Sequence, residues 1–291
     1  VLLALGVQRP GPVDPDLSRR FRVALVQSEG RSLTDLIALS RARAGRAAEL
    51  LVWPEGAIPY DVRRHEPSLA RLRDLCRDLD CVLIVGTKTD ADPEGRRWYN
   101  TALAIDQDGV IGDYRKARPV PLLADGLPGR NIEPIPTRLG PIGTPICYDC
   151  DSHSIVRRLT AAGAGVMAVP SYDARHWGTI QHLQHAELFR LRAAENARWM
   201  AVAASSGVSQ VIDPHGHVRA ELGPMKEGVI AHPVSLSERK TFYTRAGWLF
   251  PWLCLAGALA RLLTRPVRGF IARFFRRDGR RSAAGPDRAL P

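Results

Sequence analysis

The sequence has 291 residues, of which 45% are hydrophobic, and this length and composition allow one large folded domain and exclude a disordered chain. Its formal net charge of +11 would suggest a nucleic-acid or anionic membrane partner, but nine arginines and two aspartates after Ala260 carry most of it. The arginine-rich stretches before that point are balanced by acids and lack interleaved aromatic residues, so we expect no nucleic-acid partner.

The amino-terminal apolar run is too short for the core of a signal peptide. It reads "VLLALG" from Val1 and lacks the flanking regions that a signal peptide has. We interpret residues 1–20 as a linker or as the end of a preceding membrane segment.

Residues 21–240 alternate between short apolar runs and helical patterns, which is typical of a layered α/β domain. Polar residues at the ends of its strands are the natural places to look for a site. The expected strands cover residues 21–27, 50–55, 81–87, 99–106, 109–116, 141–147, 165–171, 200–206 and 208–213. The expected helices cover residues 33–49, 67–80, 153–163 and 179–199.

A second long apolar stretch follows this domain. Residues 246–260, "AGWLFPWLCLAGALA", include no charge, and the stretch reaches Thr264 if Arg261 extends to a membrane interface. We therefore predict a transmembrane helix at 241–265 and a basic tail at 266–291, which the positive-inside rule puts in the cytoplasm. The alternative is an amphipathic helix packed on the domain.

Three chemically reactive residues lie at the ends of predicted strands. Glu55 follows "LLVWP", Lys116 ends "GDYRK" and Cys147 ends "PIGTPIC". A thiol attacks an acyl carbon only as the thiolate, so it needs a base, and the oxyanion that forms needs a cation or N–H donors. Taken singly, each residue is more often a solvated charge or a core thiol. The combination of carboxylate, ammonium and thiol indicates nucleophilic catalysis without histidine.

Cys147 also forms a C-x-x-C pair with Cys150, which raises disulfide exchange and zinc binding as alternatives. The five cysteines are an odd number without framework spacing, and one such pair without a second is a weak zinc signal. His182 and His185 lie three apart on a predicted helix, where we expect both to be solvated. We therefore expect no metal and no other cofactor.

Five sequence blocks resemble those of the nitrilase, or carbon-nitrogen hydrolase, superfamily, and they stand in the same order. They are "VALVQ", "LLVWPEGAIP", "YNTALAIDQDGVIGDYRKARPVP", "PIGTPICYD" and "ENARWMAVAASSGVSQVIDPHGHV". The resemblance spans nearly all of residues 22–234 and implies a four-layer αββα sandwich. It also implies that Glu55 is the general base, that Lys116 stabilises the oxyanion and that Cys147 forms a thioester acyl-enzyme.

Within that superfamily the sequence is most similar to the apolipoprotein N-acyltransferase branch. The matching text is "LVWPEGAIP", "YRKARPVPL", "QHLQHAELFRLRAAENAR" and "KTFYTRAGWLFPWLCLAGAL". The resemblance implies that Cys147 takes a fatty acyl chain from a phospholipid and passes it to the α-amine of a diacylglyceryl-cysteine on a lipoprotein. It also implies a bacterial inner-membrane protein whose catalytic domain lies on the periplasmic or outer face.

The sequence departs from that branch at several positions. Ala124 stands where the branch has a second glutamate, with Asp125 as the nearest substitute, and Asp149 replaces a glutamate after Tyr148. The text "SYDARHWG" loosely matches a loop of the branch and makes Trp177 a candidate lid residue. The residues expected to support the site or to bind substrate are Asn100, Asp125, Tyr148, Asp149 and Trp177.

These departures leave two alternatives open. One is a carbon-nitrogen hydrolase of the same fold that cleaves a small amide, with water as the acyl acceptor. The other is a catalytically idle homologue that binds lipid or a lipoprotein. The sequence indicates no oligomeric state.

Overall fold

The computed structural model describes the backbone of residues 19–44, 48–121 and 123–278, and the side chains of these residues as far as 263. The chain divides into two units, Val1–Arg245 and Ala246–Pro291. Most of the expected linker at 1–20, and the end of the expected tail from residue 279, lie outside the described residues.

The first unit contains two mixed β-sheets, each with six strands in the described residues. The first has the order β12-β1-β2-β3-β4-β5 and consists of β12 (Gly228–Ser235), β1 (Arg20–Gln27), β2 (Leu50–Val52), β3 (Val82–Asp90), β4 (Trp98–Ile105) and β5 (Val110–Arg115). The second has the order β11-β10-β9-β8-β7-β6 and consists of β11 (Val218–Leu222), β10 (Ser209–Ile212), β9 (Met200–Ala204), β8 (Val166–Ser171), β7 (Gly140–Gly143) and β6 (Ile135–Thr137). Three central strands of each sheet, β1 to β3 and β7 to β9, run parallel, and the flanking strands are antiparallel.

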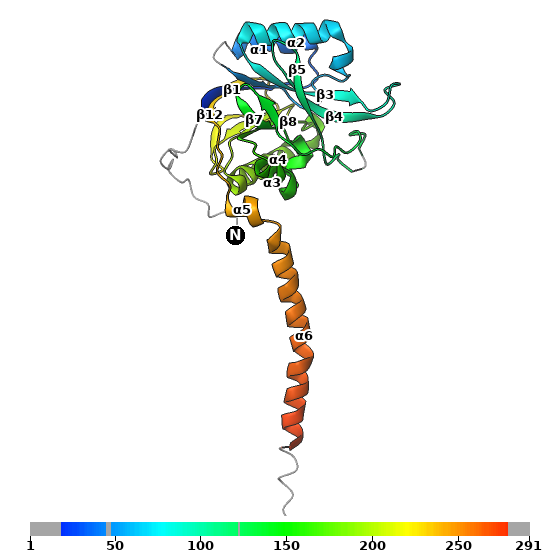
Figure 1. The fold of residues 1–291 in the computed structure, drawn as a ribbon, viewed down its shortest axis with the longest axis vertical. Coiled ribbons are helices and arrows are strands. Elements are labelled where there is room, and N and C mark those ends of the chain that lie inside the picture. The colour runs from blue at the N-terminus through cyan, green and yellow to red at the C-terminus, as the bar shows by residue number, and fades with distance from the viewer. Residues whose placement is uncertain (1–18, 45–47, 122, 279–291) are drawn as a thin grey trace, which may run out of the picture. The chain divides into compact units, whose positions relative to one another are not determined.

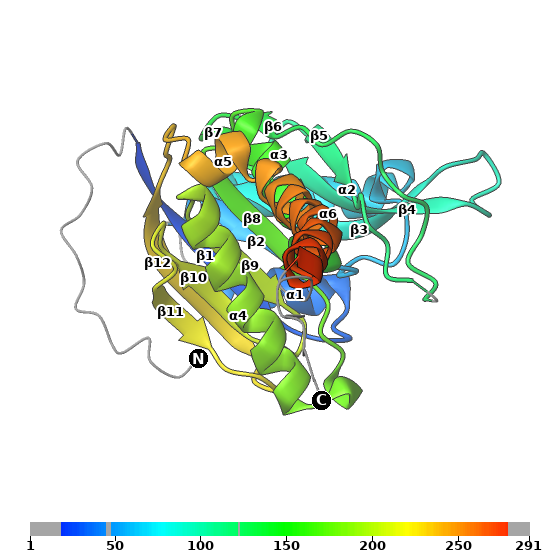
Figure 2. The same cartoon turned by 90° about the horizontal axis from the view of Figure 1, so that it is seen from below.

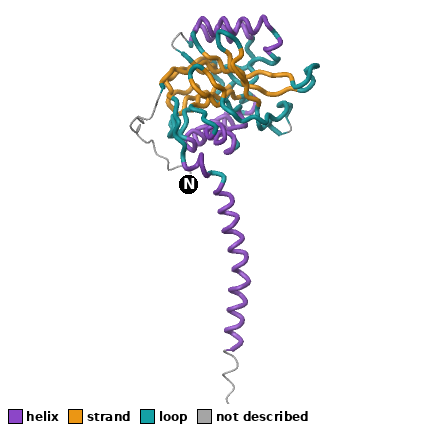
Figure 3. Tube along the Cα trace, in the orientation of Figure 1, coloured by secondary structure: helices purple, strands orange, loops and turns teal. Residues whose placement is uncertain are grey.

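Helices cover the outer faces of both sheets, and the inner faces pack on each other (Figure 1). Helices α1 (Leu33–Arg43) and α2 (Glu66–Leu79) lie on the first sheet, and α3 (His153–Ala161) and α4 (Thr179–Asn196) lie on the second. Figure 2 shows α4 lying along β9 and β10, and Figure 3 shows helices on both sides of the strands. The expected four-layer αββα arrangement is therefore confirmed. Short 3-10 turns are η2 (Val62–Arg64), η3 (Cys147–Cys150) and η4 (Arg175–Trp177).

The burial pattern explains why these residues form these layers. All residues of β2 and of β9 are buried, as expected for strands that have packed layers on both faces. Helix α2 buries only one side, through Leu72, Leu75, Cys76 and Leu79 at helical spacing. The core of the molecule therefore lies between the sheets and beneath the helices.

Two expected strands end earlier than predicted, and this changes how the site is presented. The strand expected at 50–55 ends at Val52, and the strand expected at 141–147 ends at Gly143. Proline at positions 54 and 145 has no N–H to donate to a sheet, which explains both early ends. Glu55 and Cys147 consequently lie in the segments beyond the strands.

Other boundaries and elements also differ from the prediction. The helix expected at 33–49 ends at Arg43, and the helix expected at 179–199 ends at Asn196 because Ala197 adopts a left-handed conformation with φ of 48°. Strands β6, β11 and β12 were not predicted. In β12, Pro233 masks the strand pattern, and it is tolerated because β12 lies at the edge of the first sheet.

The second unit is described as one helix, α6 (Leu249–Asp278), with α5 (Phe242–Ala246) at the boundary of the units. Helix α6 continues without a break past residue 265, where the prediction separated a membrane helix from a tail. No helix in the described part of the chain is both long enough and apolar enough to cross a membrane. The transmembrane helix predicted at 241–265 is thus not confirmed.

A close approach between β3 and the loop after β2 determines where Glu55 lies. Gly86 of β3 packs directly on the backbone of Pro54 and Glu55, and a Cβ atom at position 86 would lie 2.5 Å from the Glu55 Cα. Real Cβ atoms do not approach backbone atoms this closely, so only glycine allows the loop to cross the strand here. The position of the Glu55 carboxylate therefore depends on residue 86 being a glycine, which has no side chain.

Replacing this glycine is the first testable change. Gly86→Ala should lower the free energy of unfolding by about 2 kcal/mol, because the methyl group forces the Pro54–Glu55 backbone away from β3. Urea denaturation followed by circular dichroism measures this. Gly223→Ala is the matched control, since its new methyl group would meet no atom closer than 4.0 Å. Equal stability of the two variants would contradict the close-approach argument.

Candidate active site

Four polar side chains from four segments meet at one end of the first sheet. Lys116 follows β5, and its Nζ lies 2.8 Å from Glu55 Oε1 and 2.7 Å from Asp125 Oδ2. Asn100 of β4 donates from Nδ2 to the same Glu55 oxygen and to Asp125 Oδ1, both at 2.6 Å. Glu55 Oε2 is buried and has no hydrogen-bond partner among the described residues. One oxygen of Glu55 is therefore held in place, while the other stays available as a proton acceptor.

The structure accounts for the missing second glutamate. Ala124 is exposed, whereas the neighbouring Asp125 has a side chain that is only 12% exposed and reaches Lys116. Asp125 also accepts a hydrogen bond from the Val120 backbone N–H at 2.8 Å, which closes the loop around it. A carboxylate thus contacts Lys116 from this loop, displaced by one residue from the position that the branch uses.

Lys116 is a buried cation with two anionic partners. Its side chain is 1% exposed. Burial by itself would lower the pKa of Lys116, but Glu55, Cys147 and Asp125 together raise that pKa above its ordinary value. The side chain therefore stays an ammonium, which can stabilise negative charge on a neighbouring oxygen.

Cys147 occupies a strained turn rather than a strand end. It opens η3 with φ of 44°, a left-handed conformation that is uncommon for residues other than glycine. Its side chain is buried, and its Sγ donates to the Tyr172 carbonyl at 3.6 Å. Burial first, and then the Glu55 carboxylate, raise the pKa of the Cys147 thiol well above its ordinary value, and Lys116 acts in the opposite direction. The resting form is thus the protonated thiol, which needs a base before it can attack.

Asp149 connects the cysteine turn to the segment after Lys116. Its carboxylate is fully buried and accepts hydrogen bonds from the backbone N–H of Ile146 at 3.1 Å and of Arg118 at 2.8 Å. The Tyr114 hydroxyl donates to it at 2.9 Å. Asp149 therefore supports the site by fixing two loops to each other and does not line the cavity described next.

A cavity of about 280 Å³ opens beside Cys147. Tyr148 and Trp177 both line it, and the Trp177 ring packs edge-on against Tyr172 with centroids 6.0 Å apart. The complete lining is Val120, Leu123, Cys147, Tyr148, Asp151, Trp177, Gln181 and His185. The structure therefore puts both of these predicted residues next to the nucleophile candidate.

The two histidines of α4 are not solvated, and the prediction that they would be is wrong. His182 and His185 are buried and not solvated, because this side of the helix packs on the segment after β8. His182 Nε2 lies 3.0 Å from the Ala174 carbonyl, and His185 lies between the carboxylates of Asp151 and Asp173. Polar side chains inside a protein need such partners, and no local sequence pattern shows that they exist.

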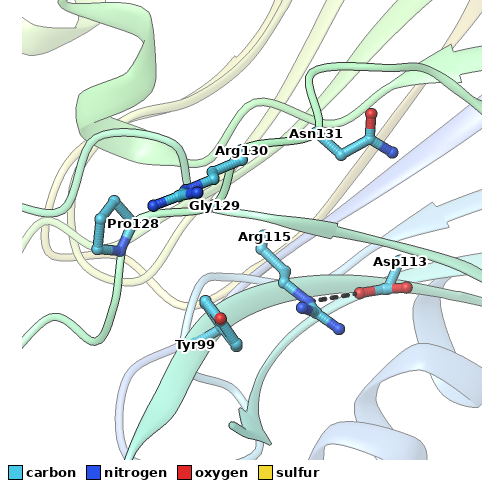
Figure 4. A pocket seen from close by; sticks show the side chains of 7 residues that line it. All are labelled: Tyr99, Asp113, Arg115, Pro128, Gly129, Arg130 and Asn131. Carbon is cyan, nitrogen blue, oxygen red and sulfur yellow. Dashed lines mark hydrogen bonds and ion pairs between the residues drawn. The ribbon is translucent and has the colours of Figure 1, made fainter.

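Figure 4 shows the residues that line a second hollow, of about 400 Å³. Two of them, Tyr99 and Arg115, directly precede Asn100 in β4 and Lys116 after the end of β5, and alternating side chains point to opposite faces of a sheet. Arg115 lies over the Tyr99 ring at 4.5 Å. None of the residues lining this hollow carries a thiol.

All five cysteines are free, so Cys147 and Cys150 form no disulfide. Within residues 19–44, 48–121 and 123–263, no three His, Cys, Asp or Glu side chains are grouped so that they could hold a metal ion.

Comparison with known proteins identifies the scaffold around this site. Residues 22–243 match the carbon-nitrogen hydrolase family. The chain belongs to that family. Among curated relatives, the apolipoprotein N-acyltransferases of Geobacter metallireducens and Rhodopseudomonas palustris are 28% and 29% identical, over 84% and 80% of this chain. The chain covers 53% and 48% of those proteins, about half of their length.

Solved structures share the carbon-nitrogen hydrolase fold. A variant of the Nesterenkonia AN1 amidase is 25% identical with a TM-score of 0.65, and the match covers 83% of this chain and 100% of the amidase. Nit3 from Saccharomyces cerevisiae, a member of branch 10 of the nitrilase superfamily, is 25% identical with a TM-score of 0.62, covering 76% and 92%. The resemblance drawn from sequence is thereby confirmed.

The raised pKa of Cys147 in this carbon-nitrogen hydrolase can be tested directly. We expect alkylation of Cys147 by iodoacetamide to keep accelerating at a pH where a reference cysteine peptide has reached its maximal rate, because burial and Glu55 disfavour the thiolate. Peptide mapping by mass spectrometry gives the rate at each cysteine, and the exposed Cys254 shows that the reagent is active. A midpoint at or below that of the reference peptide would contradict the assignment.

Proposed function

We propose that this chain transfers a fatty acyl group from a phospholipid, through a thioester on Cys147, to the N-terminal amine of a diacylglyceryl-cysteine on a lipoprotein. The observation that carries the proposal is how the two oxygens of the Glu55 carboxylate are bonded. Lys116 and Asn100 donate hydrogen bonds to one of its oxygens, and the other is buried without a hydrogen-bond partner among the residues described. The negative charge of this carboxylate acts on the Cys147 thiol and raises its pKa. Such a carboxylate can accept the thiol proton.

In the first half of the reaction, Glu55 takes the proton of Cys147 as Sγ attacks the ester carbonyl carbon. The negative charge that forms on the carbonyl oxygen is stabilised by the Lys116 ammonium. The ester C–O bond then breaks, and the leaving lysophospholipid oxygen takes the proton from Glu55. The products of this step are a thioester on Cys147 and an ionised Glu55.

In the second half, the free amine of the acceptor attacks the thioester carbon. The C–N bond forms and the C–S bond breaks, and the proton of the amine passes through Glu55 to the Cys147 sulfur. This exchange returns both residues to their starting states and releases an amide. No metal or organic cofactor takes part.

Apolar side chains at and around the cavity favour a lipid donor. Val120, Leu123, Tyr148 and Trp177 supply an apolar part of the lining. Among these, Leu123 is a large apolar side chain that is 56% exposed. An exposed apolar side chain at a cavity suits a surface that meets lipid or a partner. The names of the curated relatives support the same reaction.

We further propose that α6 attaches the chain to a membrane. Every described side chain from Trp248 to Leu263 is exposed, including Phe250 and Trp252. Aromatic residues of this kind favour the membrane interface. The proposed location is the bacterial inner membrane, with the catalytic unit on the periplasmic or outer face. Its proposed partners are the phospholipid donor, the lipoprotein acceptor and the membrane.

A small-amide hydrolase is the second candidate function. The amidase from Nesterenkonia shares the fold, and in one of its structures acrylamide has added to the active-site cysteine. In this chain, Asp151, Gln181 and His185 give the cavity a polar part that would suit a small amide. The contact of Asp125 with Lys116 argues against the third possibility, a catalytically idle homologue.

Intact-protein mass spectrometry tests the acyl-enzyme. After incubation of the detergent-solubilised chain with phospholipid, we expect a fatty-acyl mass increase that hydroxylamine removes. Cys147→Ala should abolish it, and Glu55→Gln and Lys116→Met should reduce its rate of formation about a hundredfold or more, since each removes a proton acceptor or the oxyanion cation. Cys150→Ala is the matched control and should keep the adduct. Ammonia release from small amides without any lipid adduct would instead support the hydrolase.

The proposed attachment through α6 has a separate test. In flotation with vesicles of phosphatidylethanolamine and phosphatidylglycerol, a variant with both Trp248→Ser and Trp252→Ser should partition about tenfold less than the unaltered chain, because two large apolar surfaces are lost. Val110→Ser, another exposed apolar residue but on β5, is the control. Equal partitioning of all three proteins would refute the role of α6.

A further inference from the structure

The cavity beside Cys147 contains a polar group of residues that the two-step reaction above does not use. Asp151, Gln181 and His185 line it together with the nucleophile candidate. Asp151 follows Cys147 by four residues, directly after η3, and the other two come from α4. The cavity is therefore not a uniformly apolar channel for an acyl chain.

His185 lies between the carboxylates of Asp151 and Asp173, and we call these three residues the bracket. Its Nδ1 lies 2.7 Å from Asp173 Oδ1, and its Nε2 lies 3.3 Å from Asp151 Oδ1. Burial by itself would lower the pKa of His185, but the hydrogen bonds to Asp151 and Asp173 raise it to about 9. The ring is then an imidazolium at neutral pH, with both N–H groups engaged. His185 has no donor left for a ligand, and it fixes the orientation of Asp151.

Asp151 and Gln181 keep hydrogen-bond acceptors for a ligand. The Asp151 side chain is 33% exposed, and His185 engages only one of its oxygens. Gln181 Oε1 is a buried atom without a hydrogen-bond partner among the described residues. A carboxylate and an amide oxygen in one cavity suit a ligand that brings several hydrogen-bond donors. Two carboxylates and one imidazolium also leave the bracket with one negative charge.

We propose that Asp151 and Gln181 bind the protonated amino group of the acyl acceptor, with His185 as the residue that positions Asp151. An ammonium group supplies both the donors and the positive charge that these residues match. This inference rests on the proposed function for the identity of the reaction. Before attack, the bound ammonium loses one proton to solvent. Its nitrogen then forms the C–N bond as the C–S bond breaks, and a second proton reaches Cys147 through Glu55.

The test separates binding of charge from chemistry. Cys147 is loaded with p-nitrophenyl butyrate, and release of p-nitrophenolate reports the loading rate. The thioester is then discharged either by ethanolamine, which is a cation at neutral pH, or by methoxyamine, which is neutral. We expect Asp151→Asn to raise the apparent KM for ethanolamine about tenfold or more, and to affect loading and methoxyamine discharge by a much smaller factor. Gln181→Leu should act in the same direction.

His185→Leu distinguishes positioning from general support. Loss of the bracket should impair discharge by ethanolamine selectively, whereas a merely structural role would slow both acceptors alike. Glu187→Gln is the matched control, because this exposed carboxylate of α4 pairs with Arg190 away from the cavity lining. Thermal melting of each variant establishes that it is folded.

The outcomes keep this inference apart from the proposed function. An unchanged ethanolamine-to-methoxyamine preference in folded Asp151→Asn overturns the amine subsite, whatever the acyl donor. Loading by the ester but not by phospholipid overturns the lipid donor alone. A readout that needs no acyl-enzyme is protection of Cys147 from iodoacetamide by ethanolamine. Protection that is present in the unaltered chain and lost in Asp151→Asn supports the subsite, and no protection in the unaltered chain overturns it.

Discussion

The site depends on one buried ammonium shared between two carboxylates. Lys116 is almost fully enclosed, and removing either partner of a buried ion pair leaves a charge that costs several kcal/mol. The loop after β2, the end of β5 and the loop that carries Asp125 must therefore converge on the same point. Asn100 completes the cluster by donating to both carboxylates. Gly86 makes the convergence possible because it lets the Glu55 backbone cross β3 at close range.

The same arrangement gives the two oxygens of the Glu55 carboxylate different surroundings. One oxygen accepts hydrogen bonds from Lys116 and Asn100, which restrain the side chain, and the other has no hydrogen-bond partner in the part of the chain that the structure describes. Cys147 is brought to this point by a turn whose left-handed backbone is secured through the Asp149 carboxylate. Under the proposed mechanism, a base held by two hydrogen bonds, a buried cation and a cysteine on a strained backbone turn form a preorganised site, in which little reorganisation precedes the chemistry.

The cavity is lined by both apolar and polar side chains, and this bears on the two kinds of reaction named among similar proteins. Relatives of the chain include proteins named as acyltransferases and an amidase, and both names describe acyl transfer, to an amine or to water. The scaffold and the acyl-enzyme chemistry are compatible with either acceptor. The preference for an amine or for water as the acyl acceptor therefore depends on the residues next to Cys147. In this chain they combine apolar side chains with the negatively charged bracket. We regard that bracket as the feature that favours an amine over water.

Nine of the strands, the four long helices of the first unit and the candidates Glu55, Lys116 and Cys147 could be predicted from the sequence, because apolar strands followed directly by reactive residues form a local pattern. The family followed from the resemblance of the sequence blocks, whereas β6, β11 and β12 were not predicted. Local pattern could not show that Asp125 rather than position 124 faces Lys116, since a shift of one residue in a loop depends on the path of the chain. Nor could it show that His185 is buried, because Asp151 and Asp173, its partners, come from other elements. Sequence determined which chemical groups are present and roughly where the strands end. Only the tertiary structure decided which of those groups share one buried site, because burial and charge pairing depend on segments that are distant along the chain.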